Sequence, residues 1–369
     1  MRSHFHLLQI DLPFHDFKFA SLCFVTAFIV TMIAIPVIIK LAEKYKLYDL
    51  PNERKEHTVP VPTMGGIAVI AGMMMALLLW LPFNYETEQV CFLLSVAVLF
   101  CLGIMDDVKD LSARYKFFVQ AGIATLMAIS GIRITSFEGL FGIYDLPLAA
   151  QYTFTLLTIV GVTNAFNLID GIDGLAGGIG FTSLTTLGIF LTINKDITSA
   201  LIAFSLAGGI VAFLYFNFNP AKIFLGDTGS LVLGFSIAVL CIRLMQVNTS
   251  AALPNAPLFI LSLAFIPVFD TIRVFAMRIW RGKSPFEADR THIHHLLTNA
   301  GFSHTFATRL ICGLHGFILL EVYWLKDIKG EYILLLLILF MMVVTAVLKN
   351  LRLLFKKPVV ALSRSFVEN

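Results

Sequence analysis

Adjacent carboxylates end one of the most apolar stretches of the chain. The residues before Asp106 and Asp107 are hydrophobic, and Asp110 follows closely. Two neighbouring anions at a membrane boundary repel each other unless a cation or a proton compensates them. On a helix that continued, Asp106 and Asp110 would share a face at i and i+4. The sequence leaves two interpretations open: a solvated helix end balanced by nearby basic residues, or a site for Mg²⁺, which takes oxygen ligands.

A second segment places a polar side chain at every third residue. These residues are Asn164, Asn167, Asp170 and Asp173. A period of three puts side chains on one face of a 3₁₀ turn, or on a slowly rotating face of an α-helix. Asn and Asp also cap helices and form turns. Four of them in regular register exceed the needs of one turn, which favours a binding site.

A glycine-flanked aspartate forms a third group. Asp227 lies in Gly226-Asp-Thr-Gly-Ser230, and we expect Ser230 to begin the next helix, whose N-terminus favours anions. Asn217 precedes this segment, and Phe224 could stack on a base. A plain turn with an N-cap serine is the alternative interpretation.

Histidines form the fourth group, in a basic segment. His292, His294 and His295 follow Arg290 closely. Histidine is a common zinc ligand, so a zinc site is an alternative, but no Cys or HExxH-type pairing accompanies these residues. The basic neighbours make polyanion binding more attractive than metal binding. Upstream, Asp270 and Arg273 stand at i and i+3, where we expect them only to neutralise each other.

The composition indicates that the elements that position these groups lie in a lipid bilayer and not in water. The chain has 369 residues, of which 58% are hydrophobic and only 14% are charged. A soluble domain carries roughly 25% charged residues, so a water-soluble fold is excluded and the bilayer is the solvent. The net charge of +3 comes without a basic stripe, which excludes nucleic acid as a partner.

Apolar runs predict an all-α polytopic membrane protein. A membrane barrel would instead show alternating segments of about ten residues. We predict one domain over residues 1–369, with the polar groups in a core over about 54–297 and a basic cytoplasmic tail at 349–369. Runs that could cross about 30 Å of hydrocarbon predict eleven membrane helices at residues 19–39, 65–81, 90–105, 117–134, 147–166, 175–193, 198–216, 230–245, 256–275, 306–324 and 332–348.

The distribution of Lys and Arg predicts the orientation. Most of the 27 basic residues fall in the loops after the odd-numbered helices and in the tail, and the positive-inside rule makes that side cytoplasmic. The N-terminus is then outside and the C-terminus inside. The inner loops, at residues 52–63, 106–116, 164–173, 217–230 and 278–304, carry nearly all the groups capable of chemistry.

Together these motifs resemble the polyprenyl-phosphate N-acetylhexosamine-1-phosphate transferases, glycosyltransferase family 4, the superfamily with the WecA, TagO and more distant MraY branches. The matching motifs run in the family's order from Arg54 to Leu297. They are Arg54-Lys55-Glu56-His57 before Met64-Gly65-Gly66, Asp106-Asp107-Val-Lys-Asp110, Leu111-Ser-Ala-Arg-Tyr-Lys116, Asn164-Ala-Phe-Asn167-Leu-Ile-Asp170-Gly-Ile-Asp173-Gly, Phe224-Leu-Gly-Asp227-Thr-Gly-Ser230 and His292-Ile-His294-His295.

The resemblance implies a reaction. The family transfers a sugar 1-phosphate from a UDP-N-acetylhexosamine to undecaprenyl phosphate, releases UMP, and uses Mg²⁺, with Mn²⁺ as a substitute. The implied location is the bacterial inner membrane, with the active site at the cytoplasmic face and a cell-envelope polysaccharide as the downstream product. The His-Ile-His-His form resembles the GlcNAc-using branch, so UDP-GlcNAc is the expected donor, and another UDP-N-acetylhexosamine is the alternative. The sequence leaves both a monomer and a homodimer open.

The resemblance also implies residue roles. Asn167 and Asp227 would ligate Mg²⁺, with the catalytic Asp106 and Asp107 beside it as candidate proton acceptors; direct attack by the lipid phosphate is favoured over a covalent aspartyl intermediate. Phosphate binding falls to Lys116, which together with His57 would hold the lipid phosphate. The nucleotide would be bound by Lys55, Asp170, Asp173, Asn217 and Phe224, and the sugar and diphosphate by Arg290, His292, His294 and His295.

A protein of another class remains an alternative. An ion-coupled transporter also carries carboxylates and histidines near its apolar helices. Such transporters usually show paired repeats and helices broken at the membrane midplane, whereas the polar groups here gather at one face. A zinc membrane hydrolase is a further alternative, which removal of Mg²⁺ or Zn²⁺ would separate from a transferase.

Overall fold

The computed structural model describes residues 14–45, 48–49, 61–82, 86–248, 253, 255–284 and 291–355. In these ranges the apolar stretches form helices, because a helix satisfies its backbone hydrogen bonds within one segment. The helices are α1 Phe14–Tyr45, α2 Gly65–Trp80, α3 Thr87–Lys109, α4 Ala113–Ser130, α5 Leu148–Ile169, α6 Leu175–Ile193, α7 Ile197–Asn217, α8 Gly226–Val247, α9 Ala256–Ser262, α10 Phe265–Trp280, α11 Ile293–Thr298, α12 His304–Trp324 and α13 Gly330–Phe355, with a 3₁₀ turn η1 at Leu140–Gly142.

The helices suit a multi-pass membrane protein, as the sequence predicted. In the described part of the chain, eight are long and apolar enough to cross a membrane, and α9 with α10 forms a bent pair that could be a ninth span. Helix α2 is apolar but shorter. With α4, these elements correspond one to one with the eleven predicted stretches. The number of spans and their orientation stay predictions.

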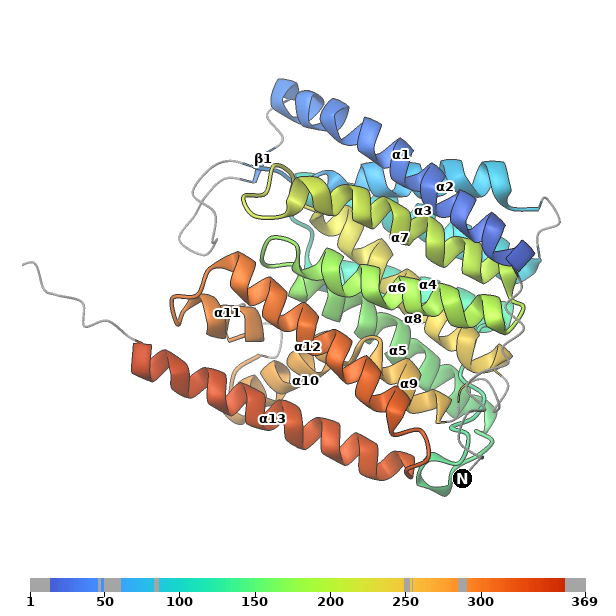
Figure 1. Ribbon diagram of the computed structural model, residues 1–369, viewed down its shortest axis with the longest axis vertical. Helices are drawn as coiled ribbons and strands as arrows, with labels where there is room; N and C mark the ends of the chain where they lie inside the picture. The colour runs from blue at the N-terminus through green and yellow to red at the C-terminus, as the bar shows by residue number, and fades with distance from the viewer. Residues whose placement is uncertain are drawn as a thin grey trace, which may run out of the picture.

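Helix α8 forms the centre of the bundle. The helices lie side by side along a common direction, with α1 and α13 at opposite edges (Figure 1). In the most apolar part of each helix, 78% of α8 is buried, against 22% of α1 and of α13. Helix α8 contacts α2, α3, α5, α6 and α7. A residue at the start of α8 is therefore held from several sides.

Glycines let α2 and α3 approach α8 closely. A Cβ atom on Gly103 of α3 would lie 2.3 Å from the Cα of Thr228, and one on Gly66 of α2 would lie 2.3 Å from the backbone nitrogen of Gly229. Neither position has room for a side chain, because the obstacles are backbone atoms. Small residues support such close packing of membrane helices. The result is that the end of α3 is fixed against the beginning of α8.

Three helices are longer at one end of the bundle than the sequence predicted. Helix α3 includes Asp106 and Asp107, and α5 includes Asn167. Helix α8 begins at Gly226 instead of Ser230, so Asp227 lies in its first turn. The predicted boundaries were wrong because polar residues were assigned to loops. In the structure these polar side chains lie on helices and form hydrogen bonds or ion pairs with residues of other helices.

The helix does not continue far enough for Asp106 and Asp110 to share a face. Helix α3 ends at Lys109, and Asp110 is its C-cap in the left-handed conformation, with φ at 51°. The N–H of Leu111 donates to Asp106 Oδ1 at 2.6 Å. This bond turns the chain toward α4 and leaves Asp110 off the helix.

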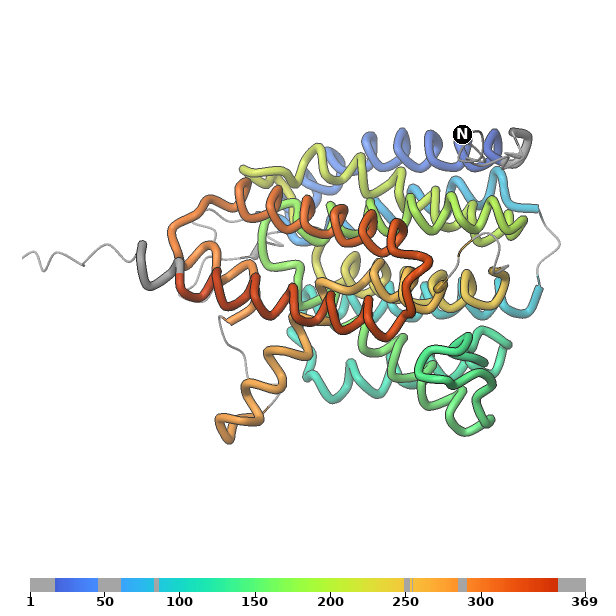
Figure 2. The backbone as a smooth tube through the Cα atoms, turned by 60° about the horizontal axis from the view of Figure 1, so that its bottom comes forward, coloured from blue at the N-terminus to red at the C-terminus, as the bar shows by residue number. Residues whose placement is uncertain are grey.

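A sharp bend separates α9 from α10. The two helices differ in direction by 75°, and α10 projects from the bundle (Figure 2). At the bend, the carbonyl of Leu263 accepts a hydrogen bond of 2.6 Å from Ser183 Oγ on α6. A side chain of a neighbouring helix thus satisfies the backbone group that the bend leaves without a helical partner.

A short hairpin accompanies the helices, which the all-α prediction did not include. Strand β1 Tyr48–Asp49 pairs antiparallel with β2 Val61–Pro62. The N–H of Phe224 donates to the Pro62 carbonyl at 2.7 Å, and the N–H of Gly65 donates to the Phe224 carbonyl at 2.9 Å. These bonds join the segment before α2 to the segment before α8.

Candidate active site

Nine of the predicted site residues line one cavity of about 780 Å³. It lies where α3, α5 and α7 end and where α6 and α8 begin, with His295 of α11 and His304 of α12 on its wall. The prediction that chemistry-bearing groups gather at one end of the bundle is confirmed for the described residues. A second cavity, of about 360 Å³, surrounds Arg243 at the other end and contains none of them.

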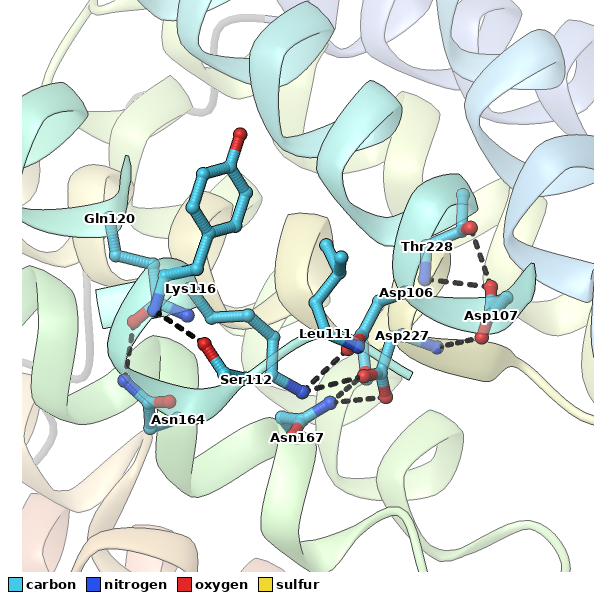
Figure 3. Close-up of polar contacts among 12 residues, drawn as sticks. Asp106, Asp107, Leu111, Ser112, Lys116, Gln120, Asn164, Asn167, Asp227 and Thr228 are labelled. Atoms are coloured by element: carbon cyan, nitrogen blue, oxygen red, sulfur yellow. Dashed lines mark hydrogen bonds and ion pairs between the residues drawn. The ribbon is translucent and has the colours of Figure 1, made fainter. Parts of the chain in front are cut away.

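Lys116 joins two carboxylates from different helices. Its Nζ lies 2.5 Å from Asp106 Oδ2 and 3.1 Å from Asp227 Oδ2 (Figure 3). The side chain of Asp106 is almost fully buried and that of Lys116 is mostly buried. A buried charge is costly unless it is paired, so the ammonium compensates repulsion between the two anions. The start of α4 therefore supplies the cation that the carboxylates at the end of α3 and the start of α8 require.

Asn167 reaches the same carboxylate from α5. Its Nδ2 donates to Asp227 Oδ1 at 2.7 Å and to Ser230 Oγ at 3.0 Å (Figure 3). One turn earlier, Asn164 Nδ2 donates to Gln120 Oε1 of α4 at 2.5 Å. The period of three residues thus serves two tasks: Asn164 ties α5 to α4, and Asn167 faces Asp227.

Asp107 caps α8 from α3. Its Oδ1 accepts from the N–H of Asp227 at 2.8 Å, and its Oδ2 accepts from the N–H and the hydroxyl of Thr228 at 3.1 and 2.6 Å. The first N–H groups of a helix have no partner within it, and an anion there is favourable. Gly226 is required beside this cap, because its φ is +72° and a Cβ atom would lie 2.0 Å from the Thr63 carbonyl oxygen.

Asp170 and Asp173 lie between α5 and α6, on the cavity wall. Burial raises the pKa of Asp170 to about 8, and repulsion from Asp227, Asp107 and Asp173 adds to this shift. Burial also acts to raise the pKa of Asp173, but interaction with His304 and hydrogen bonds from Asn219 and the Ala221 N–H outweigh it, so this pKa lies below its ordinary value. The two carboxyls therefore differ in their proton affinity although three residues separate them.

Asn217 lies on the cavity wall, but its amide is used to hold two loops together. Its Oδ1 accepts from the N–H of Gly174 at 2.8 Å, and its Nδ2 donates to the Ile223 carbonyl at 2.9 Å. This places the segment before α8 against the start of α6. Phe224, predicted to stack on a base, is half-buried on the same wall.

The histidines divide into one that lines the cavity and two that are buried behind it. His295 lines it. His292 Nδ1 lies 2.8 Å from Asp270 Oδ2, and His294 packs on Gly171, where a Cβ atom would lie 2.5 Å from its Nε2. Their rings are close, with 4.1 Å between the centroids of His294 and His295. Three further predicted residues, Lys55, His57 and Arg290, lie outside the described residues.

Two residues were missed by sequence reasoning. His304, at the start of α12, lines the cavity with its Nδ1 3.8 Å from Asp173 Oδ1. Asp270 pairs with Arg273 as predicted, at 2.6 Å, but it also contacts His292 and the N–H of Ile293. A carboxylate inside an apolar stretch was the available signal for Asp270, because such a group needs partners. No comparable signal marked His304.

The donor atoms around Asp227 suit a hard cation. In the described part of the chain, no three carboxylate, histidine or cysteine side chains are arranged to hold a metal ion. Mg²⁺ commonly takes one or two protein carboxylates and completes its shell with water and substrate phosphates. Asp227 with Asn167 fits that pattern, because a rotation of the Asn167 amide exchanges its donor nitrogen for its acceptor oxygen.

Comparisons with known proteins show which family the chain resembles. A model of glycosyl transferase family 4 matches residues 89–245. The chain is 33% identical over 88% of its length to a probable undecaprenyl-phosphate N-acetylglucosaminyl 1-phosphate transferase of Bacillus subtilis, of which 91% is covered. It is 35% identical to an undecaprenyl-phosphate alpha-N-acetylglucosaminyl 1-phosphate transferase of Yersinia pestis, over 75% of this chain and 76% of that protein. For the Escherichia coli K12 protein of the same name, the identity is 31% over 72% of each chain.

Proposed function

The chain belongs to glycosyl transferase family 4, and from this premise we propose that it transfers N-acetylglucosamine 1-phosphate from UDP-GlcNAc to undecaprenyl phosphate and releases UMP. It is a phosphotransferase, which rules out the ion-coupled transporter. One observation carries the proposal: the Lys116 ammonium lies between Asp106 and Asp227, two carboxylates that line a cavity of about 780 Å³. A cavity of this size is typical of small-molecule sites.

Charge neutralisation is the main chemical task of such a site. A donor diphosphate and an acceptor phosphate repel each other, and phosphoryl transfer requires little beyond positioning and electrostatic stabilisation. Lys116 is the described cation best placed for this, since it already bridges two carboxylates at the cavity. In the proposal, Lys116 exchanges part of its contact with Asp106 and Asp227 for a substrate phosphate.

We assign Mg²⁺ to Asp227 and Asn167, with Mn²⁺ as a substitute. When bound there, the ion would neutralise the diphosphate and stabilise the departing UMP. Ser230 Oγ accepts from Asn167 Nδ2 at 3.0 Å in the present orientation of the amide, and its hydroxyl can donate to the amide oxygen after the rotation. Asp107 keeps Asp227 in position through its cap on α8.

The transfer is proposed as a direct displacement. An oxygen of the lipid phosphate bonds to the β-phosphorus of UDP-GlcNAc, and the bond from that phosphorus to the bridging oxygen breaks, so that the bridging oxygen leaves with UMP. Asp106 is the proposed proton acceptor for a lipid phosphate that arrives protonated, because Asp107 is fully engaged in capping α8. A covalent aspartyl intermediate is the alternative, and release of UMP before lipid binds would support it.

The nucleotide and the sugar are assigned to different residues around the cavity. Asp170, Asp173 and Phe224 would contact the nucleoside, and Asn217 would act by holding the loops that carry them. The sugar and diphosphate would meet His295, with His292 and His294 behind it. We place this end of the bundle at the cytoplasmic face of the bacterial inner membrane, because its loops carry most of the Lys and Arg residues.

A release assay tests the proposal. Detergent-purified protein would receive Mg²⁺ and undecaprenyl phosphate with UDP-GlcNAc, UDP-GalNAc or UDP-MurNAc-pentapeptide in separate reactions. We expect lipid-dependent UMP release with UDP-GlcNAc. Release with another donor alone would replace the proposed sugar and keep the reaction. Release with none, from folded protein, would contradict the proposed function.

A further inference from the structure

Asp270 is a buried carboxylate of α10 that faces the beginning of α11. It is only 2% exposed. Its Oδ1 accepts from Arg273 Nη2 at 2.6 Å and from Nε at 3.2 Å, and its Oδ2 lies 2.8 Å from His292 Nδ1. Burying a charge without partners is costly. The close contacts of both oxygens with Arg273 and His292 offset the cost of burying the Asp270 carboxylate.

Asp270 supplies the cap that α11 lacks. The N-cap residue His292 offers no capping hydrogen bond from its side chain. Instead, the N–H of Ile293 donates to both oxygens of Asp270 at 3.2 Å. Arg273, held by the same carboxylate, donates from Nη2 to the carbonyl of Thr291 at 2.6 Å. The pair on α10 thus fixes three consecutive residues at the start of α11.

The rest of α11 reaches the candidate active site. His294 packs against Gly171, in the turn between α5 and α6, and His295 lines the cavity. Helix α11 has only six residues, so its direction is set by what holds its ends. A change at its start would shift His295, whereas Asp270 and Arg273 do not themselves line the cavity.

Helix α10 is in turn anchored to the bundle. The bend of 75° before it begins at Leu263, whose carbonyl accepts from Ser183 Oγ. Ser183 also lies 3.1 Å from Nε2 of the buried His315 on α12. Helix α10, which carries Asp270, is therefore held at the bend by Ser183 of α6, and the same hydroxyl contacts α12.

We propose that Asp270 is a positioning residue for the donor substrate: by holding His292 and the backbone of Ile293, it sets the orientation of α11 and the place where His295 meets the sugar diphosphate. This inference rests on the proposed function. It assigns Asp270 no contact with substrate and no part in the bond-making step.

The geometry also specifies a spectroscopic signature. An ionised carboxylate only accepts hydrogen bonds, so His292 must carry hydrogen on Nδ1, which faces Asp270. Replacing Asp270 by Asn puts an amide there that can donate as well as accept. The Nδ1–H form of His292 then loses its preference over the Nε2–H form.

The test compares Asp270→Asn with Asp196→Asn. Asp196 is also a largely buried carboxylate bound to an arginine, Arg243, at 2.5 Å, but it lies at the other end of the bundle. We expect Asp270→Asn to raise the KM for UDP-GlcNAc about tenfold or more, since small displacements of a contact group can be that costly. The KM for undecaprenyl phosphate should stay within about twofold, and Asp196→Asn should leave both KM values near wild type.

Nitrogen-15 NMR of ring-labelled histidine supplies the second measurement. We expect an Nδ1–H signal for His292 in the wild type and in Asp196→Asn, and a tautomer mixture in Asp270→Asn.

If Asp270→Asn does not fold, Arg273→Lys replaces it in the test, with an expected several-fold rise in the KM for UDP-GlcNAc. An unchanged donor KM, or an equal rise in Asp196→Asn, would overturn the inference. A wild type that releases no UMP would refute the proposed function instead, and an absent Nδ1–H signal in that protein would still refute the role of Asp270.

Discussion

Lys116 Nζ lies 2.5 Å from Asp106 Oδ2, at the point where α3 ends and α4 begins. A single loop therefore brings a buried anion and its cation together, and Asp227 of α8 completes the group at 3.1 Å. Removing the cation would leave two carboxylates facing each other. Substituting these residues one at a time can therefore measure what each charge contributes to activity and to stability.

Lys116→Met is expected to lower the rate of UMP release on the order of 100-fold or more, because a positioned cation at a phosphoryl-transfer site contributes that much. Initial rates at saturating donor and lipid would measure it. The control is Arg114→Met, which removes an exposed cation from the same turn of α4 and should retain most of the activity. Equal losses in the two variants would contradict the role of Lys116.

The acidic pair should separate into a catalytic and a supporting residue. Asp107→Asn exchanges an acceptor oxygen in the cap of α8 for a donor and should destabilise the protein by about 1–2 kcal/mol, seen as a lower Tm in detergent. Asp106→Asn should keep a Tm closer to wild type while the rate of UMP release falls. The same loss of Tm in both, or near-wild-type rates in both, would refute this division.

Close packing at Gly103 should be essential for the site. In Gly103→Ala the new methyl group would meet the backbone of Thr228 at 2.3 Å, which should cost about 1–3 kcal/mol of stability and separate Asp106 from Asp227. Gly122→Ala, on α4, is the matched control because a Cβ atom there meets no atom within 4 Å. That variant should gain about 0.5–1 kcal/mol. Thermal unfolding and UMP release would be measured for both.

Asp170 should make stability depend on pH. Its pKa in the folded protein, about 8, lies above the ordinary value of 3.8. Between these values the folded protein keeps a proton that the unfolded chain has released, so stability falls as the pH rises. The Tm of Asp170→Asn, in Mg²⁺-free detergent, should exceed that of the wild type by an amount that grows from pH 4 to pH 8. Parallel Tm curves for Asp170→Asn and the wild type would contradict this prediction.

Removal of divalent cations should abolish activity. After EDTA treatment and desalting, we expect UMP release to return with Mg²⁺ or Mn²⁺, because the donors at Asp227 and Asn167 are oxygen atoms. Restoration by Zn²⁺ alone would contradict the proposed Mg²⁺ site. Asp227→Asn should require a higher Mg²⁺ concentration for half-maximal rate than Asp106→Asn, since only the former removes a proposed ligand.

The membrane helices were predictable because an apolar run is a local property. The positions at which these helices end at the site were not predictable, because the residues that contact the helix ends are distant in sequence. The N–H groups that make Gly226 the start of α8 are satisfied by Asp107. The role of Asn217 depends on the backbone of Gly174, and that of Asp270 on His292. The motifs identified which residues matter, whereas only the fold separates those that line the cavity from those that hold its walls.

The cap of Asp107 on Asp227 joins residues 120 positions apart. When α3, α4 and α5 have been synthesised, the growing chain contains Asp106, Lys116 and Asn167, but it still lacks Asp227 and the donors for Asp107. Assembly of the chemical centre must then wait for α8 to enter the bundle. The order of synthesis therefore keeps the growing chain inactive at least until its central helix is inserted.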